Sequence, residues 1–336
     1  MARRLPAEWE KQDAVLMAFP HEATDWAEDL RSALTPFVRI ASAVAWDQPL
    51  VLLCRDQESV KPHFCDTRNI TFLELPYNDT WTRDYGPVTV YEEGRRKFLD
   101  FTFNGWGGKF TANLDNAVTE TLVKKGYLFG EYEKIDFVLE GGSIESDGQG
   151  TLLTTARCLL HPNRNPSYTQ AQIETLLKEK LGVQRILWLE EGELLGDDTD
   201  AHIDTLARFV DTQTIAHVTC DDPNDPHYER LGRMREQIKS FRTQENRPYR
   251  LVPLPLPAPK YDKKGNRLPA TYANYLVTNK AVLLPTYDDP KDKEMVALFQ
   301  TLYPGREIIP INCLPLIRQG GSLHCSTMQI PAYYEG

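Results

Sequence analysis

Four stretches of the sequence carry an acid, an imidazole or a thiol, and three of them place it beside glycine or aromatic residues. The clearest two are HID, which holds His202 and Asp204, and GGSLHC, which ends at Cys325. Residues i and i+2 of a strand face the same side, so we expect His202 and Asp204 to point into one site. By the same rule, His324 faces away from Cys325 on its expected strand, which leaves His202 as the partner of the thiol. These groups predict nucleophilic catalysis.

Two more carboxylates complete the set. Asp84 lies in the sequence WTRDYGP, where Trp81, three residues earlier, can pack against a cationic substrate. Glu140 stands before two glycines, which allow a ligand to approach the backbone closely. Three carboxylates around a thiol indicate a substrate that carries positive charge.

Hydrolysis of a guanidinium group needs this set of side chains. The group is a cation with a pKa above about 12, so it arrives charged and is a poor electrophile. Paired carboxylates hold its N–H fork in a bidentate manner. A thiolate then adds to the central carbon and forms a covalent intermediate. A histidine protonates the departing ammonia and later deprotonates the attacking water.

Each motif also has a simpler interpretation when taken alone. Asp84 can be a turn residue, Glu140 can end a strand, and a lone cysteine is usually a buried thiol. His202 can form a structural pair, or hold a metal with Asp198 or Asp200, although no further histidine lies nearby. The four motifs together favour a catalytic site.

The elements that position these residues follow a repeating pattern. A polar residue opens a short strand, and a turn, a second strand, a helix and a further strand follow. The openers are Asp84, Glu140, Asp204, Asn274 and Cys325, which are roughly 50 to 70 residues apart. Five such units account for the chain if the fifth is shared between its two ends.

The expected elements follow from hydrophobic periodicity and turn signals. The expected strand pairs are 87–91 with 97–103, 142–146 with 151–155, 203–210 with 214–219 and 275–277 with 281–285, and a last strand covers 322–330. Further strands are expected at 71–75, 185–189 and 306–311. Expected helices cover 27–46 and 113–125, a third follows a capping box of Ser167 with Gln170 and stops at Gly182, and a fourth starts at residues 289–290. Residues 253–267 read as a long loop that can act as a lid.

The bulk composition of the 336 residues is that of a globular protein, with 41% hydrophobic and 26% charged residues. The net charge of −10 argues against nucleic acid as a partner. No apolar run approaches the roughly 20 residues that cross a membrane. Six cysteines lack a CxxC pair, so neither a zinc site nor a disulfide framework is indicated. We expect one cytoplasmic domain, residues 1–336, with no nucleic-acid or membrane partner.

The motifs resemble those of the agmatine deiminase and bacterial-type (Porphyromonas-type) peptidylarginine deiminase family, in the guanidine-modifying superfamily. The similarity runs through WTRD, FNGWGG, EGGS, LTT, NRNP, TDAHID and residues 320–329, and so covers nearly the whole chain. The sequence departs from the family at Ala201, where a glycine is usual, and at Ala156, where a glutamate is usual. Gln319 and Ser322, beside the cysteine, also differ from the longer plant-type sequences. None of these departures removes a catalytic group.

The resemblance implies a fold and a set of roles. The fold is an α/β class five-bladed, pseudo-fivefold propeller, a pentein, built from ββαβ modules. The implied roles are nucleophile for Cys325, general acid and base for His202, guanidinium binding for Asp84 and Asp204, support of positive charge for Glu140, and pocket wall for Trp81. The family needs no metal or organic cofactor and commonly forms homo-oligomers.

The implied reaction is deimination of agmatine to N-carbamoylputrescine and ammonia, a step of putrescine and polyamine biosynthesis. Free arginine carries an α-carboxylate, which needs a cationic partner in a closed pocket. We expect Arg83, Arg157, Arg208 and Arg318 to point or lie away from the catalytic positions. Peptidylarginine deimination is the alternative reaction. A non-catalytic propeller that binds partners and a papain-like thiol hydrolase are the alternatives from other classes, and the latter has no use for three carboxylates.

Replacement of the expected nucleophile gives the first test. Cys325→Ser should lose essentially all turnover while it folds normally, because a hydroxyl is hardly ionised near neutral pH without a strong base. Ammonia release and circular dichroism, measured on the same preparation, separate loss of chemistry from loss of fold. A variant that keeps wild-type turnover would remove Cys325 from the reaction.

Overall fold

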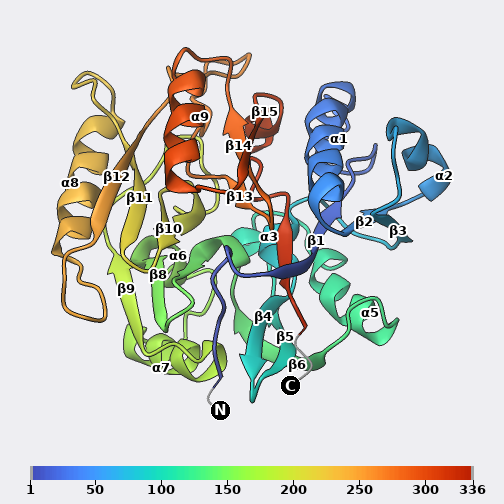
Figure 1. Cartoon of the computed structure of the whole chain (residues 1–336), viewed down its shortest axis with the longest axis horizontal. Helices are drawn as coiled ribbons and strands as arrows, with labels where there is room; N and C mark the ends of the chain where they lie inside the picture. Colours follow the sequence, from blue (N-terminus) through green and yellow to red (C-terminus); the bar gives the residue numbers. More distant parts are fainter. Residues whose placement is uncertain (1–2, 334–336) are drawn as a thin grey trace.

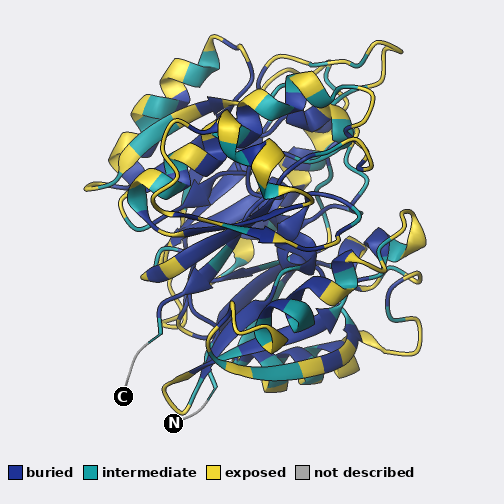
Figure 2. Cartoon of the chain, turned by 90° about the vertical axis from the view of Figure 1, so that its right-hand side faces the viewer, coloured by how far each residue is buried: buried dark blue, intermediate teal, exposed yellow. Residues whose placement is uncertain are grey.

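Five small β-sheets make up the inner part of the molecule, and the longer helices lie at its periphery (Figure 1). The computed structural model describes residues 3–333. Buried residues fill the strands, whereas exposed residues alternate with buried ones along the outer helices (Figure 2). The middle strands β8 (Thr151–Thr155), β11 (Thr214–Thr219) and β14 (Ala281–Thr286) are buried along their whole length. Full burial of a strand means that both of its faces are covered.

Four of the sheets have three strands and one shared topology. In each sheet the first two strands are antiparallel and the third is parallel to the second. The sheets are β4 (Val88–Glu92), β5 (Arg95–Thr102) and β6 (Glu131–Val138); β7 (Ile144–Ser146), β8 and β9 (Arg185–Leu189); β10 (Ala207–Asp211), β11 (Thr214–Thr219) and β12 (Arg250–Pro255); and β13 (Leu276–Val277), β14 and β15 (Glu307–Asn312).

A helix connects the two parallel strands of each of these sheets, as parallel pairing requires. These helices are α5 (Val118–Lys124), α7 (Gln170–Leu181), α8 (His227–Ser240) and α9 (Lys291–Leu302). The order strand, strand, helix, strand is the ββαβ module expected from the sequence, and it occurs four times.

The fifth sheet joins the two ends of the described chain. Its order is β16 (Met328–Pro331), β1 (Gln12–Ala18), β2 (Leu50–Cys54) and β3 (Ile70–Glu74). β16 pairs antiparallel with β1, while β1 and β2 are parallel and connected by α1 (Leu30–Asp47). The prediction that one unit is shared between the chain ends is therefore confirmed.

The expected strand positions of three site residues are wrong. Cys325 lies in a turn over residues 323–326, before β16. His202 and Asp204 lie at the turn Ile203–Thr205, and β10 begins only at Ala207. Side chains satisfy the backbone here in place of a strand ladder. Thr205 Oγ1, for example, donates to the carbonyl of His202 at 2.8 Å.

Two local predictions also need correction. The capping box of α7 is formed by Thr169 and Gln172, two residues after the expected pair of Ser167 and Gln170. The start of the expected loop at 253–267 belongs to β12. The stop at Gly182 is confirmed, since its φ of 68° is the left-handed conformation that glycine adopts most easily. Among the described residues, no helix is long and apolar enough to span a membrane.

Candidate active site

The five residues expected to do chemistry lie close together and are all buried, with at most 5% of any of them exposed. They come from the turns that precede β4, β7, β10 and β16. His202 lies between two carboxylates, with Nδ1 3.6 Å from Asp84 Oδ1 and Nε2 3.9 Å from Glu140 Oε2. The Sγ atom of Cys325 lies 3.9 Å from Asp204 Oδ2.

Asp84 is held by two N–H donors, one on each carboxylate oxygen. The indole Nε1 of Trp106 donates to Oδ2 at 2.9 Å, and the backbone N–H of Gly142 donates to Oδ1 at 2.9 Å. Asp84 belongs to the single turn α3 (Thr82–Tyr85) rather than to the start of a strand. Trp106 belongs to the FNGWGG similarity, but no pattern in the sequence indicates that its indole contacts Asp84.

Gly142 lies where a larger residue would fill the site. A Cβ atom at this position would lie 2.6 Å from His202 Nδ1, 2.8 Å from Asp84 Oδ1 and 3.2 Å from Asp204 Oδ2. All three distances are shorter than ordinary van der Waals contacts with carbon. The two glycines that follow Glu140 were expected to allow close approach, and Gly142 does so with three site residues at once.

Arg164 fixes the carboxylate of Glu140. Its Nε lies 2.9 and 3.0 Å from the two carboxylate oxygens, and its Nη1 donates to Asp200 at 2.8 Å. Although burial raises the pKa of Glu140, His202 and Arg164 lower it below its usual value. No local sequence pattern indicates a role for Arg164, because its partners Glu140 and Asp200 are remote in the chain.

His202 is favoured in its charged form. Burial lowers its pKa, but Asp84, then Cys158 and Glu140, raise the pKa well above its usual value. An imidazolium is the form that can give a proton to a leaving amine. The residue before it, Ala201, has a φ of 67°. That conformation favours glycine, which agrees with the usual glycine of the family at this position.

Asn274 is a site residue that the sequence analysis recognised only as the opener of a strand. Its Oδ1 accepts from the backbone N–H groups of His324 and Cys325 at 2.9 and 3.3 Å. Its Nδ2 donates to Cys325 Sγ at 3.3 Å. Because two backbone donors already engage the oxygen, the amide presents its N–H to the sulfur, where it can stabilise a thiolate.

A pocket of about 260 Å³ opens onto this site. Cys325, Asp84 and Trp81 line it, and Gly321 packs so closely on Trp81 that an added Cβ would lie 2.4 Å from the ring. The other lining residues include four carboxylates and part of the expected lid, namely Asp25, Asp79, Asp198, Asp262, Asn266, Arg267 and Leu268. The loop expected near the site therefore forms part of the pocket wall.

One group of metal-ligating atoms occurs in residues 3–333. Glu140, Cys158 and His202 each bring one such atom within 4.8 Å of the others. Arg164 already contacts both oxygens of Glu140, so a cation there would meet a fixed positive charge. The alternative pairing of His202 with Asp198 or Asp200 is not part of this group.

Comparisons with known proteins agree on one family. The model of the family described as Porphyromonas-type peptidyl-arginine deiminase matches residues 4–331. A Vibrio parahaemolyticus protein with the provisional name agmatine deiminase is 36% identical over 348 residues, which cover 97% of this chain and 96% of that protein.

Two solved structures are similar over nearly their whole length. A protein provisionally called an arginine deiminase from Porphyromonas gingivalis is 49% identical, with a TM-score of 0.94 and 98% of each chain covered. A cysteine-to-serine variant of C. jejuni agmatine deiminase with substrate bound is 40% identical, with a TM-score of 0.93 and 100% and 98% of the two chains covered.

The space around Gly142 leads to a prediction. Gly142→Ala should lower kcat/KM by about 100-fold or more, because the methyl group displaces the imidazole and the carboxylate that it meets. Gly232→Ala is the matched control, since a Cβ there has no neighbour within 4 Å and the residue lies in α8. Steady-state kinetics of both variants check this, and equal activity of the two would contradict the close packing.

The thiol of Cys325 provides a second prediction. Burial, then Asp204 and Asp84, raise its pKa well above the usual value. Alkylation of the free protein should therefore be slow at neutral pH and become faster as the pH rises, because the thiolate is the reactive form. A bound, inert amidinium compound that leaves the thiol accessible reverses the local field and should speed alkylation.

Mass spectrometry of the peptide that contains Cys325 measures this labelling at several pH values, with and without the amidinium compound. Cys65, which is exposed, serves as the internal reference. Slower or unchanged labelling of Cys325 with the cation bound would count against activation by the substrate.

Proposed function

The chain belongs to the Porphyromonas-type peptidyl-arginine deiminase family, and from this starting point we propose that it hydrolyses agmatine to N-carbamoylputrescine and ammonia. One observation carries the proposal. The buried thiol of Cys325 and the carboxylate of Asp84 line a pocket that holds further acids. Behind them, His202 lies between Asp84 and Glu140, and Asp204 lies 3.9 Å from the sulfur. This arrangement suits a substrate that is cationic at both ends.

The reaction proceeds in two balanced steps. Asp84 and Asp204 bind the guanidinium, and the thiol of Cys325 releases its proton to solvent. Its Sγ then adds to the central carbon of the guanidinium as a thiolate. A proton from His202 leaves with the nitrogen as ammonia, so that a C–S bond forms and a C–N bond breaks. His202 then takes a proton from water and the hydroxyl adds to the same carbon. The C–S bond breaks while the remaining proton of the hydroxyl passes to the departing sulfur, which gives a neutral urea group and restores the thiol of Cys325.

Glu140 and Trp81 take supporting roles in this reaction. Glu140 stabilises the imidazolium form of His202 from 3.9 Å, while Arg164 fixes its orientation. Trp81, at the pocket wall, packs against the plane of the cation. Asn274 donates a hydrogen bond to the sulfur.

The wall of the pocket favours an amine tail over a carboxylate. Two arginines line it, and each is already bonded to an aspartate: Arg318 to Asp29 at 2.6 Å and Arg267 to Asp225 at 3.1 Å. The expectation that Arg318 lies away from the site is wrong, since the turn before Gly320 brings it to the pocket. Its charge is nevertheless engaged, so the α-carboxylate of free arginine lacks a ready partner.

Arg208 also lies nearer to the site than expected. It is buried and bonded to Glu145 at 2.8 Å, and it contributes to lowering the pKa of Asp204. Arg83 was expected to point away from Asp84. It does so, because its guanidinium contacts Gln329 and Glu8.

The arrangement of the five sheets completes the proposal. We propose that the five sheets surround a pseudo-fivefold axis as a propeller, and that residues 1–336 form one catalytic domain. The repeated module and the joining of β16 to β1 support this. A cytoplasmic homo-oligomer in putrescine biosynthesis stays a prediction, as does a closing movement of the loop that holds Asp262 and Arg267.

A comparison of three substrates tests the proposal. Agmatine should give a higher kcat/KM than free arginine and than a blocked arginyl peptide, because only agmatine brings a cation to the acidic wall and avoids an unpaired carboxylate. Ammonia release from each, measured side by side, provides the values. A kcat/KM for the peptide equal to or above that for agmatine would favour peptidylarginine deimination instead. Lack of turnover with all three would favour a binding module.

A further inference from the structure

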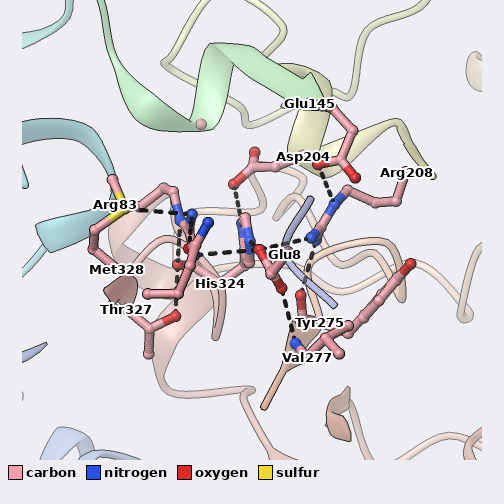
Figure 3. A network of polar contacts seen from close by, with 12 residues as sticks. Glu8, Arg83, Glu145, Asp204, Arg208, Tyr275, Val277, His324, Thr327 and Met328 are labelled. Atoms are coloured by element: carbon pink, nitrogen blue, oxygen red, sulfur yellow. Dashed lines mark hydrogen bonds and ion pairs between the residues drawn. The ribbon is translucent and has the colours of Figure 1, made fainter. Parts of the chain in front are cut away.

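A network of buried charged side chains connects Asp204 with His324, Glu8 and Arg208 (Figure 3). His324 lies in its middle, with Nδ1 2.8 Å from Asp204 Oδ2 and Nε2 2.6 Å from Glu8 Oε2. None of the three residues is more than 7% exposed, and none of them lines the substrate pocket. Glu8 and His324 line a separate, smaller cavity. The residue next to the nucleophile thus uses its imidazole to join two carboxylates.

Hydrogen-bond chemistry sets the role of the imidazole. An ionised carboxylate only accepts hydrogen bonds, so a ring nitrogen of His324 that faces one must donate. Such charge-assisted bonds are about twice as strong as neutral ones. Asp204 Oδ2 is therefore engaged by His324. Asp204 Oδ1 is buried and has no hydrogen-bond partner within the described part of the chain, which leaves it as an acceptor for a substrate N–H.

Glu8 is itself held firmly in its charged form. Its Oε1 accepts from the backbone N–H of Val277 at 2.8 Å, and its Oε2 lies 3.0 Å from Arg208 and 3.6 Å from Arg83. Although burial raises the pKa of Glu8, His324 and then Arg208 hold it well below its usual value. Glu8 comes from the segment before β1. This segment therefore brings a fixed negative charge to His324, in the turn that also holds Cys325.

From this geometry we propose that His324 and Glu8 are positioning residues for substrate binding. His324 holds Oδ2 of Asp204 and thereby directs the unpaired Oδ1 to the guanidinium, and Glu8 fixes the imidazole from its other side. The inference rests on the proposed function, because it requires a guanidinium substrate. Fixing an acceptor before the substrate arrives avoids the cost of ordering it on binding.

The affinity of a protein that binds without turnover tests this role. In a Cys325→Ser background, His324→Leu removes both donors and should weaken the Kd for agmatine by about 30-fold, the range for a lost hydrogen bond to a charged group. His324→Asn places an amide N–H near the position of Nδ1 and should keep the Kd within about 5-fold of the parent. Glu8→Gln, which keeps the side-chain shape and folds more readily, should weaken it by about 10-fold.

A double-mutant cycle separates positioning from a purely structural role. His324→Leu or Glu8→Gln added to Asp204→Asn should cause no further loss of affinity, because both act through Asp204. The proposal is overturned if the losses of affinity from His324→Leu and Asp204→Asn multiply in the double variant. It is also overturned if His324→Asn and His324→Leu weaken the Kd equally. His217→Asn is the matched control, since His217 is a buried histidine on β11 that bonds a backbone carbonyl, and it should keep the parent Kd.

Binding by the Cys325→Ser parent distinguishes a failure of the proposed function from a failure of the positioning role. If the Cys325→Ser protein binds neither agmatine, arginine nor an arginyl peptide by calorimetry, the proposed function fails and the positioning role fails with it. If the parent binds agmatine and the His324→Leu and Glu8→Gln proteins bind it equally well, only the positioning role is overturned.

Discussion

The burial of three carboxylates around one thiol is the constraint on which the site depends. Asp84, Glu140 and Asp204 are all nearly inaccessible to water, and an uncompensated buried charge costs several kcal/mol or shifts its pKa until it is neutral. A different group compensates the charge of each carboxylate. Asp84 receives two N–H donors, Glu140 receives a guanidinium and Asp204 receives an imidazole. The residues that compensate these charges are thus as necessary as the residues that react.

This constraint explains why the whole chain is needed to make a small site. Arg164 follows β8, His324 precedes β16, and Glu8 precedes β1, so the partners come from separate modules and from both ends of the chain. The pairing of β16 with β1 brings the last two together. Glu8 also bonds the backbone at Val277, in the strand β13. Sheet closure and charge compensation therefore depend on one another.

The sequence indicated the reacting groups and the repeating module, because residue type and local periodicity encode both. β8, β9 and β11 have the bounds expected from apolar runs. The partners were not predictable in the same way. Nothing near Arg164 or Glu8 in sequence reveals a carboxylate or imidazole that lies far away along the chain. A period-2 pattern predicts strands at His202 and Cys325, but the chain forms turns at both positions. The backbone N–H groups there bond to polar side chains, Thr199 and Asn274, and such bonds leave no period-2 signal in the sequence.

The charge balance also links selection of the substrate to its conversion. Before binding, burial and then the carboxylates of Asp204 and Asp84 hold the pKa of the Cys325 thiol well above its usual value. In the proposed reaction a guanidinium brings a positive charge to these carboxylates, so we expect the thiolate to form only where a suitable electrophile is present. The reaction then removes that charge, because a urea group is neutral. A neutral product no longer satisfies Asp84 and Asp204 as a cation does, and the same imbalance that drew the substrate in favours release of the product.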